Sequence, residues 1–173
     1  MRFCSLFAIA AAAVAASSVP ASAQMQPLSD PVVGRGDPES HFTSDDPALH
    51  RNKQAALHIM RELLQCNQWD RAREWLTERY IQHNPNAASG VDGVVQFFTE
   101  VLGREPVEDC GPLTTEVVAV LADADLVTVV MPRVYPHPDR PGEVYYTTWF
   151  DMWRFVDGRA DEHWDPARIE PRP

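Results

Sequence analysis

The sequence predicts an α+β fold in which three helices precede an antiparallel sheet of about four strands. Two observations support this prediction. Apolar residues recur at helical spacing in the first half of the chain, whereas β-branched and aromatic runs, separated by turns, follow Pro112. After removal of an N-terminal leader about 150 residues remain, which suits one domain with a single core.

Residues 1–23 have the pattern of a secretory signal. Arg2 precedes an apolar run from Phe7 to Ala16, and small residues at 21–23 form a cleavage site. The run is too short and too poor in large side chains to favour a membrane anchor. We therefore expect an exported chain, periplasmic or secreted, that has no membrane association after cleavage.

The charge of the chain excludes some partners. The formal net charge is −10, and it becomes −11 once Arg2 is removed with the signal. Such a surface argues against nucleic acid and anionic membranes as partners.

Residues 24–45 contain scattered prolines and glycines, which predict a flexible lead-in to a single domain at 46–170. Asp45 or Asp46 followed by Pro47 is a typical helix start, and apolar spacing continues that helix to about Gln65. A shorter helix is expected at 69–76 and a third at 91–102. Between them, residues 80–86 form a short extended piece. Its alternation places Tyr80, Gln82 and Asn84 on one side and Ile81 and His83 on the other.

The expected strands are 114–121, 126–134 and the two arms of a hairpin over 142–166, with a long loop at 133–142. Alternation puts an acidic side chain, Asp151, in the middle of an otherwise apolar hairpin face. That face comprises Tyr145, Thr147, Trp149, Asp151, Trp153 and Phe155.

The turn at Asp157-Gly158 decides which residue lies opposite Asp151. A two-residue loop pairs Val156 with Arg159, so that Asp151 faces Trp164. A three-residue loop pairs Phe155 with Arg159, so that Asp151 faces His163. The hairpin rules slightly favour the shorter loop, but a one-residue slip would move the whole His163/Asp165 pair to the other side of the sheet. We therefore predict the longer loop, which gathers these titratable groups beside Asp151.

Cys66 and Cys110 remain after the predicted processing, each in a connection that follows a helix. In an exported protein they either form a disulfide or stay as two buried thiols, and the sequence leaves both open.

Two segments, YIQHNPN leading into GVDGVVQFF and then FDMWRFVDGRADEHWD, resemble the SnoaL-like polyketide cyclase branch of the nuclear-transport-factor-2-like superfamily. The resemblance covers roughly 48–169. It implies a cone-shaped fold with an apolar pocket, and a homodimer formed through the outer face of the sheet. The apolar character of both hairpin faces agrees with such a dimer.

The resemblance also implies roles for particular residues. His163 and Asp165 match the histidine and the acid/base aspartate of the cyclases, and Asp151 matches an aspartate that donates to an enolate oxygen in related ketosteroid isomerases. The base of those isomerases corresponds to Asn84, whose amide cannot accept a proton, which argues against steroid isomerase chemistry.

The chemistry itself supports an acid/base site. Aldol-type closure needs a base and donors for the developing enolate oxygen. We predict Asp165, His163 and Asp151 as catalytic residues acting on a small carbonyl compound, without a cofactor. The residues assigned to substrate binding are Gln82, His83, Asn84, Trp149 and Trp153.

Two other hypotheses stay open at this point. The pocket could hold a small molecule without turnover in a dimeric binding module. Alternatively, His83 and His163 with Asp151 or Asp165 could supply two imidazoles and a carboxylate to a metal, although their spacing is not that of a known metal motif.

Overall fold

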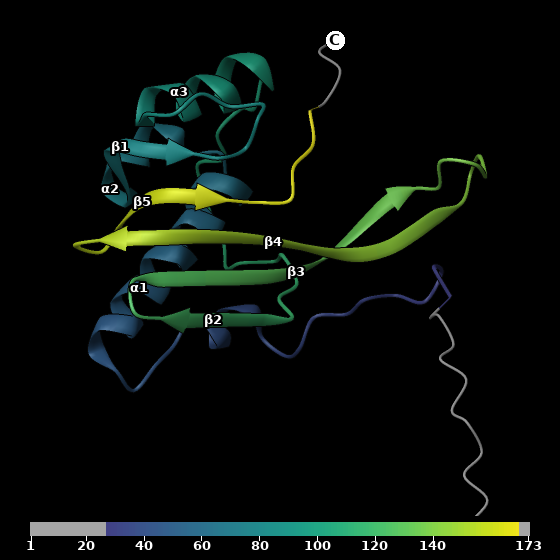
Figure 1. The fold of residues 1–173 in the computed structure, drawn as a ribbon, viewed down its shortest axis with the longest axis horizontal. Helices are drawn as coiled ribbons and strands as arrows, with labels where there is room; N and C mark the ends of the chain where they lie inside the picture. The colour runs from purple at the N-terminus through teal and green to yellow at the C-terminus, as the bar shows by residue number, and fades with distance from the viewer. Residues whose placement is uncertain (1–26, 170–173) are drawn as a thin grey trace, which may run out of the picture.

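The computed structural model describes residues 27–169, in which helices cover one face of an open, curved sheet (Figure 1). The predicted signal at 1–23 lies outside the described residues. No helix in the described part of the chain is long and apolar enough to span a membrane.

The sheet has five strands in the order β1-β5-β4-β3-β2. The strands are β1 (Leu76–Gln82), β2 (Ala119–Asp123), β3 (Leu126–Pro136), β4 (Val144–Val156) and β5 (Arg159–Trp164). The strands β2 to β5 pair in antiparallel fashion, as expected, and β1 joins the edge in parallel with β5. The prediction of about four strands therefore missed one, because the first residues of the short extended piece, 80–82, are the end of β1, whose partner β5 comes about 80 residues later.

The helices form in three groups. The first is η1 (Pro38–His41), followed by α1 (Pro47–His58), which continues as the π-helical η2 (Ile59–Gln65). The second is η3 (Trp69–Arg71) with α2 (Ala72–Trp75), and the third is α3 (Val91–Gln96) with η4 (Phe97–Val101). The side chain of Asp46 caps α1 by accepting from the backbone N–H groups of Ala48 and Leu49. In Figure 1, α1 crosses behind the sheet and α3 lies by its β1 edge.

The lead-in differs from the flexible segment that the sequence predicts. Phe42 is fully buried in the core. The backbone N–H of Arg35 donates to the carbonyl of Val117 at 2.9 Å, and that of Tyr146 donates to Leu28 at 2.9 Å. An aromatic side chain that the core can bury outweighs the turn-forming composition around it.

The turn between β4 and β5 corrects the predicted register. Val156 pairs with Arg159, so the loop is the two-residue one, and Asp157 and Gly158 both have positive φ, as a type I′ turn requires. The predicted pairing of Phe155 with Arg159, and that of Asp151 with His163, are therefore wrong. Trp153 lies opposite His163 instead.

A β-bulge nevertheless returns His163 to the predicted face. The register shifts between Arg154 and Phe155, so that Asp161 and Glu162 both lie opposite Arg154. The Arg154 guanidinium donates to both carboxylates at 2.8 Å. The extra residue offsets the shorter turn, and His163 is buried on the inner face of the sheet.

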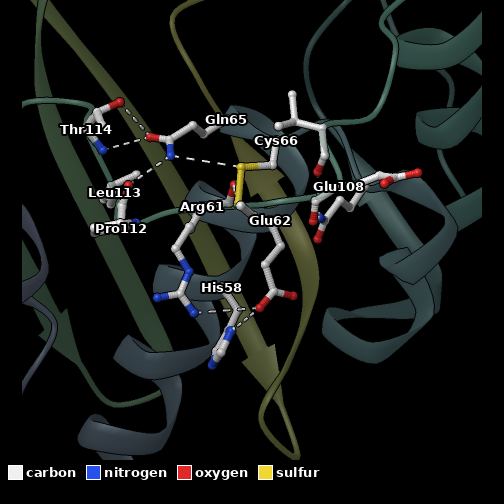
Figure 2. Close-up of a disulfide and its surroundings, with 12 residues drawn as sticks. His58, Arg61, Glu62, Gln65, Cys66, Glu108, Pro112, Leu113 and Thr114 are labelled. Carbon is white, nitrogen blue, oxygen red and sulfur yellow. Dashed lines mark hydrogen bonds and ion pairs between the residues drawn. A yellow bond between two sulfur atoms is a disulfide. The ribbon is translucent and has the colours of Figure 1, made fainter.

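A disulfide between Cys66 and Cys110 ties the end of η2 to the connection before β2, with 5.7 Å between the Cα atoms (Figure 2). Beside it, the side chain of Gln65 accepts from the backbone of Thr114 at 2.7 Å and donates to the carbonyl of Pro112 at 3.1 Å. Closing a loop of this length contributes about 2–4 kcal/mol to stability. The alternative of two free thiols is thereby excluded.

The carboxylate in the bulge makes stability depend on pH. Hydrogen bonds from Arg79, and then from Thr77 and Arg154, lower the pKa of the buried Asp161 to about 2. That value lies below the unfolded value near 3.9, so the stabilisation is present above about pH 4 and is lost as the pH falls toward 2.

We expect Asp161→Asn to lower the free energy of unfolding at pH 7 by about 1–2 kcal/mol, allowing for solvent around the exposed Arg79. Urea denaturation followed by tryptophan fluorescence should show the gap to wild type closing between about pH 4 and pH 2. The exposed Asp123→Asn, at the end of β2, is the matched control and should show no such gap. A gap that stays constant over this pH range would contradict the assignment.

Candidate functional site

A cavity of about 320 Å³ lies between the inner face of the sheet and the helices. Its helical side is mostly apolar and includes Met60, Leu63 and Phe98, with Gln65 as a polar exception. Its titratable groups come from the strands and from the segment just after β5. The lining residues from β1, β3, β4, β5 and the segments just after β1 and β5 are Leu76, Tyr80, Gln82, Asn84, Met131, Arg133, Trp149, Asp151, Trp153, His163 and Asp165.

Strand alternation explains how these side chains meet. Trp149, Asp151 and Trp153 take every second position of β4 and therefore share its inner face. β5 brings in His163, through the bulge, from one side. β1 brings Gln82 next to it, because Gln82 pairs with His163 in the parallel ladder. The site is thus built on regular strands, which hold side chains more rigidly than loops do.

His163 is buried and both of its ring nitrogens have partners. Nδ1 lies 2.7 Å from Oε1 of Gln82, and Nε2 lies 3.2 Å from Oδ1 of Asp151. The backbone N–H of Asn84 donates to the same Gln82 oxygen at 3.0 Å, which identifies that atom as the amide oxygen. An amide oxygen only accepts, so Nδ1 of His163 carries the hydrogen.

The pair of His163 and Asp151 therefore holds a second proton. Oδ1 of Asp151 already accepts from the indole N–H of Trp149 at 3.0 Å. A hydrogen bond between that oxygen and Nε2 needs one proton on either atom, because Nδ1 is already occupied. The pair is either an imidazolium with a carboxylate or an imidazole with a carboxylic acid. In both forms it has a proton that it can give to a substrate oxygen.

Asp165 lies just after β5 and, unlike the His163–Asp151 pair, only accepts hydrogen bonds. Its Oδ2 accepts from the side-chain amide of Asn84 at 2.8 Å, and its Oδ1 accepts from the backbone N–H of Ala167 at 2.9 Å. Both oxygens of Asp165 thus accept a hydrogen bond from a neighbouring donor. One ligand atom each from Asp151, His163 and Asp165 lies within 4.8 Å of the others. A proton acceptor thus stands beside a proton donor.

Seven of the eight predicted site residues line this cavity, and His83 does not. His83 lies on the other face of the sheet, where Nε2 is 2.8 Å from Glu162 and its ring stacks on Trp164 at 5.1 Å. The structure therefore places His83 outside this cavity, and alternation from Gln82 is the reason. The imidazoles of His83 and His163 do not converge, so the two cannot hold one metal together.

Two lining residues were missed as site residues. Tyr80 is buried with its hydroxyl accepting from the indole N–H of Trp153 at 3.1 Å, and burial raises the pKa of this phenol, so it stays a neutral O–H. Arg133 was expected at the start of a loop, but β3 continues to Pro136. Extending the alternation of Val129 and Met131 by one more step would have placed Arg133 on the inner face.

The SnoaL-like domain family model matches residues 57–163. No curated protein matches the chain. Among solved structures, similarity is found to a candidate SnoaL-like polyketide cyclase from Jannaschia sp. CCS1, with 20% identity over 72% of this chain and 91% of that one and a TM-score of 0.49.

Two further solved structures are similar at the same level. TsrD from Streptomyces laurentii is 18% identical over 70% of this chain and 89% of its own, with a TM-score of 0.43. An NTF2-like protein of unknown function from Burkholderia pseudomallei is 15% identical over 68% and 91%, with a TM-score of 0.49.

The hydrogen-bond argument at His163 can be tested directly. Long-range ¹H–¹⁵N NMR of the imidazoles should show Nδ1 of His163 protonated at pH 7. Replacing Gln82 by Met removes the acceptor at nearly constant length, and should shift the ring toward the tautomer with hydrogen on Nε2. His83, whose partner is Glu162, should be unaffected and is the internal control. An unprotonated Nδ1 in the wild-type protein would refute the assignment.

Proposed function

Because the chain belongs to the SnoaL-like domain family, we propose that it catalyses an aldol-type condensation or cyclisation, or a related proton transfer, on a small carbonyl compound. Membership of this family supports a cyclase-type function in general. The observation that carries the finer proposal is the convergence of Asp165, His163 and Asp151 in one sheltered cavity.

The proposed reaction begins at a carbon next to a carbonyl group. Asp165 takes the proton from this carbon, and the C–H electron pair moves to form an enolate. The His163–Asp151 pair stabilises the developing oxygen charge by hydrogen bonding or by giving its proton. The enolate carbon then attacks a second carbonyl carbon of the substrate, and the resulting alkoxide takes the proton that Asp165 removed, which returns Asp165 to the carboxylate. Any proton that the His163–Asp151 pair gave to the enolate oxygen returns to the pair as the first carbonyl re-forms. A C–C bond forms, and no oxidant or reductant is consumed.

The surroundings suit this chemistry. Apolar helix residues and two tryptophans enclose the reacting groups, which lowers the local dielectric and strengthens the hydrogen bonds to a developing oxyanion. The volume of about 320 Å³ falls at the lower end of the range for small-molecule pockets. A small substrate would leave little room for water around its enolate.

One observation favours a second candidate, a small-molecule-binding module without turnover. Both oxygens of Asp165 already accept hydrogen bonds from Asn84 and Ala167, so neither oxygen is without a partner when a substrate enters. In that case the same cavity would bind a ligand, and its polar groups would only orient it.

Export and dimerisation complete the proposal. The leader pattern at 1–23 supports export, and so does the Cys66–Cys110 disulfide, because such bonds persist in oxidising compartments. The outer face of the sheet supports a homodimer: it exposes several large apolar side chains on neighbouring strands, namely Leu121, Val134, Val144 and Phe150.

The catalytic proposal is tested by Asp165→Asn, which keeps the size of the side chain and removes its basicity. Native mass spectrometry of the protein purified from the periplasm identifies a co-purified ligand, and the intact mass shows whether residues 1–23 are gone. We expect turnover of that compound to fall about 10²–10⁴-fold while its affinity changes little. Asp157→Asn, at the exposed turn, is the matched control. Wild-type turnover in Asp165→Asn would exclude this residue as the base.

The dimer proposal is tested by Phe150→Glu, which places a charge on the outer face. Light scattering after size-exclusion chromatography at micromolar concentration should give a dimer mass for the wild type and a monomer mass for the variant. Leu102→Glu, at an equally exposed apolar residue away from the sheet, should stay dimeric. A monomer mass for the wild-type protein in the same measurement would contradict the dimer proposal.

A further inference from the structure

A second cavity, of about 690 Å³, adjoins the first and shares Asn84, Arg133 and Trp149 with it. It lies at the part of β3 and β4 that runs beyond the neighbouring strands, an arm visible in Figure 1. The segment after β5 forms another wall, where the Asn86 side chain donates to the carbonyl of Arg168 at 2.8 Å. We call this space the outer cavity, and its lining residues are Asn84, Asn86, Arg133, Tyr135, Tyr145, Thr147, Thr148, Trp149, Pro166, Ala167 and Arg168.

The outer cavity has a charge opposite to that of the chain. Its lining includes two arginines and no carboxylate, although the formal net charge of the protein is −10. Neither Arg133 nor Arg168 forms an ion pair with any residue in 27–169. By contrast, the outer-face arginines Arg79 and Arg154 both pair with Asp161. Two cations that form no ion pair in one concave space are suited to bind an anion.

Aromatic rings, not acids, position the Arg133 guanidinium. It lies 5.3 Å from the ring centroid of Trp149 and 5.9 Å from that of Tyr135, and Tyr135 in turn lies 5.7 Å from Tyr145. Contacts with ring faces hold a guanidinium without using its N–H donors. Those donors therefore stay available for a carboxylate, while the half-buried rings of the cavity wall suit a planar, conjugated body.

We propose that the outer cavity binds the carboxylate of a planar, unsaturated substrate, with Arg133 and Arg168 as its cationic partners. This proposal rests on the proposed function, because it places the reacting carbonyl of the same molecule in the inner cavity. The charges set the orientation: Asp165 repels an anion from the inner cavity, and the two arginines attract it to the outer one. Arg133 lines both spaces and stands at their junction.

The test uses 2-naphthoate and its neutral analogue 2-naphthamide as probes, with binding to the full-length processed protein measured by isothermal titration calorimetry. Wild type should bind 2-naphthoate about tenfold or more tightly than 2-naphthamide, the advantage expected for a charge-assisted hydrogen bond. This preference should shrink as salt is raised, because the cavity is open to solvent.

Arg133→Met and Arg168→Met should each remove most of the preference while leaving 2-naphthamide affinity unchanged, and the neutral probe thereby reports that the cavity is still folded. Arg159→Met, at an exposed arginine in the hairpin, is the matched control and should bind both probes like wild type. Equal affinity of wild type for the two probes would overturn the proposal, and so would a preference that survives in both arginine variants.

Asp165→Asn separates this inference from the proposed function. The variant should keep or strengthen its preference for 2-naphthoate, because a nearby negative charge has been removed. If it keeps both the preference and full turnover, the catalytic proposal fails and the anion site stands. If it loses turnover but wild type shows no preference for the anion, the anion site fails alone.

Discussion

The paired hydrogen bonds from Arg154 to Asp161 and Glu162 are the interaction on which the candidate site depends. They stabilise a bulge in which two residues of β5 lie opposite one residue of β4. Without the extra residue, the two-residue turn at Asp157-Gly158 would point His163 to the outer face. This charged cluster lies on the outer face of the sheet, away from the cavity. Hydrogen bonds from Arg79 to Asp161 and between His83 and Glu162 stabilise it further.

The charged groups on the two faces of β5 are thus hydrogen-bonded in different ways. On the outer face, carboxylates and arginines neutralise one another in a network. On the inner face, His163, Asp151 and Asp165 form no ion pair with an arginine or lysine of the described residues, and amide, indole and backbone groups bond to them instead, beside the contact between His163 and Asp151. Neutral donors and acceptors orient the imidazole and the carboxylates without neutralising them as an arginine would. These groups can therefore still exchange protons with a substrate.

The disulfide and the arm of β3 and β4 position the other walls of the two cavities. The Cys66–Cys110 bridge anchors the end of η2, whose apolar side chains form the wall opposite the carboxylates. The arm of β3 and β4 leaves the sheet body and carries Arg133 and the aromatic residues of the outer cavity. The inner cavity thus holds the carboxylates among apolar walls, the outer one has aromatic walls and no carboxylate, and Arg133 borders both. A ligand with one anionic end and one carbonyl end matches this division.

The sequence by itself determined the family, the α+β class and most of the residues that line the inner cavity, because these rest on local patterns. Alternation along β4 places Trp149, Asp151 and Trp153 together whatever the strand pairs with, and the cap at Asp46 depends only on its neighbours. Tertiary structure decided what depends on distant partners. The parallel pairing of β1 with β5 made a fifth strand and turned His83 away from the cavity, and burial against the core ordered Phe42. The bulge at Asp161 reversed the effect of the turn on His163, because an extra residue moves every later residue of the strand to the opposite face. The rules for the turn alone do not predict such a bulge.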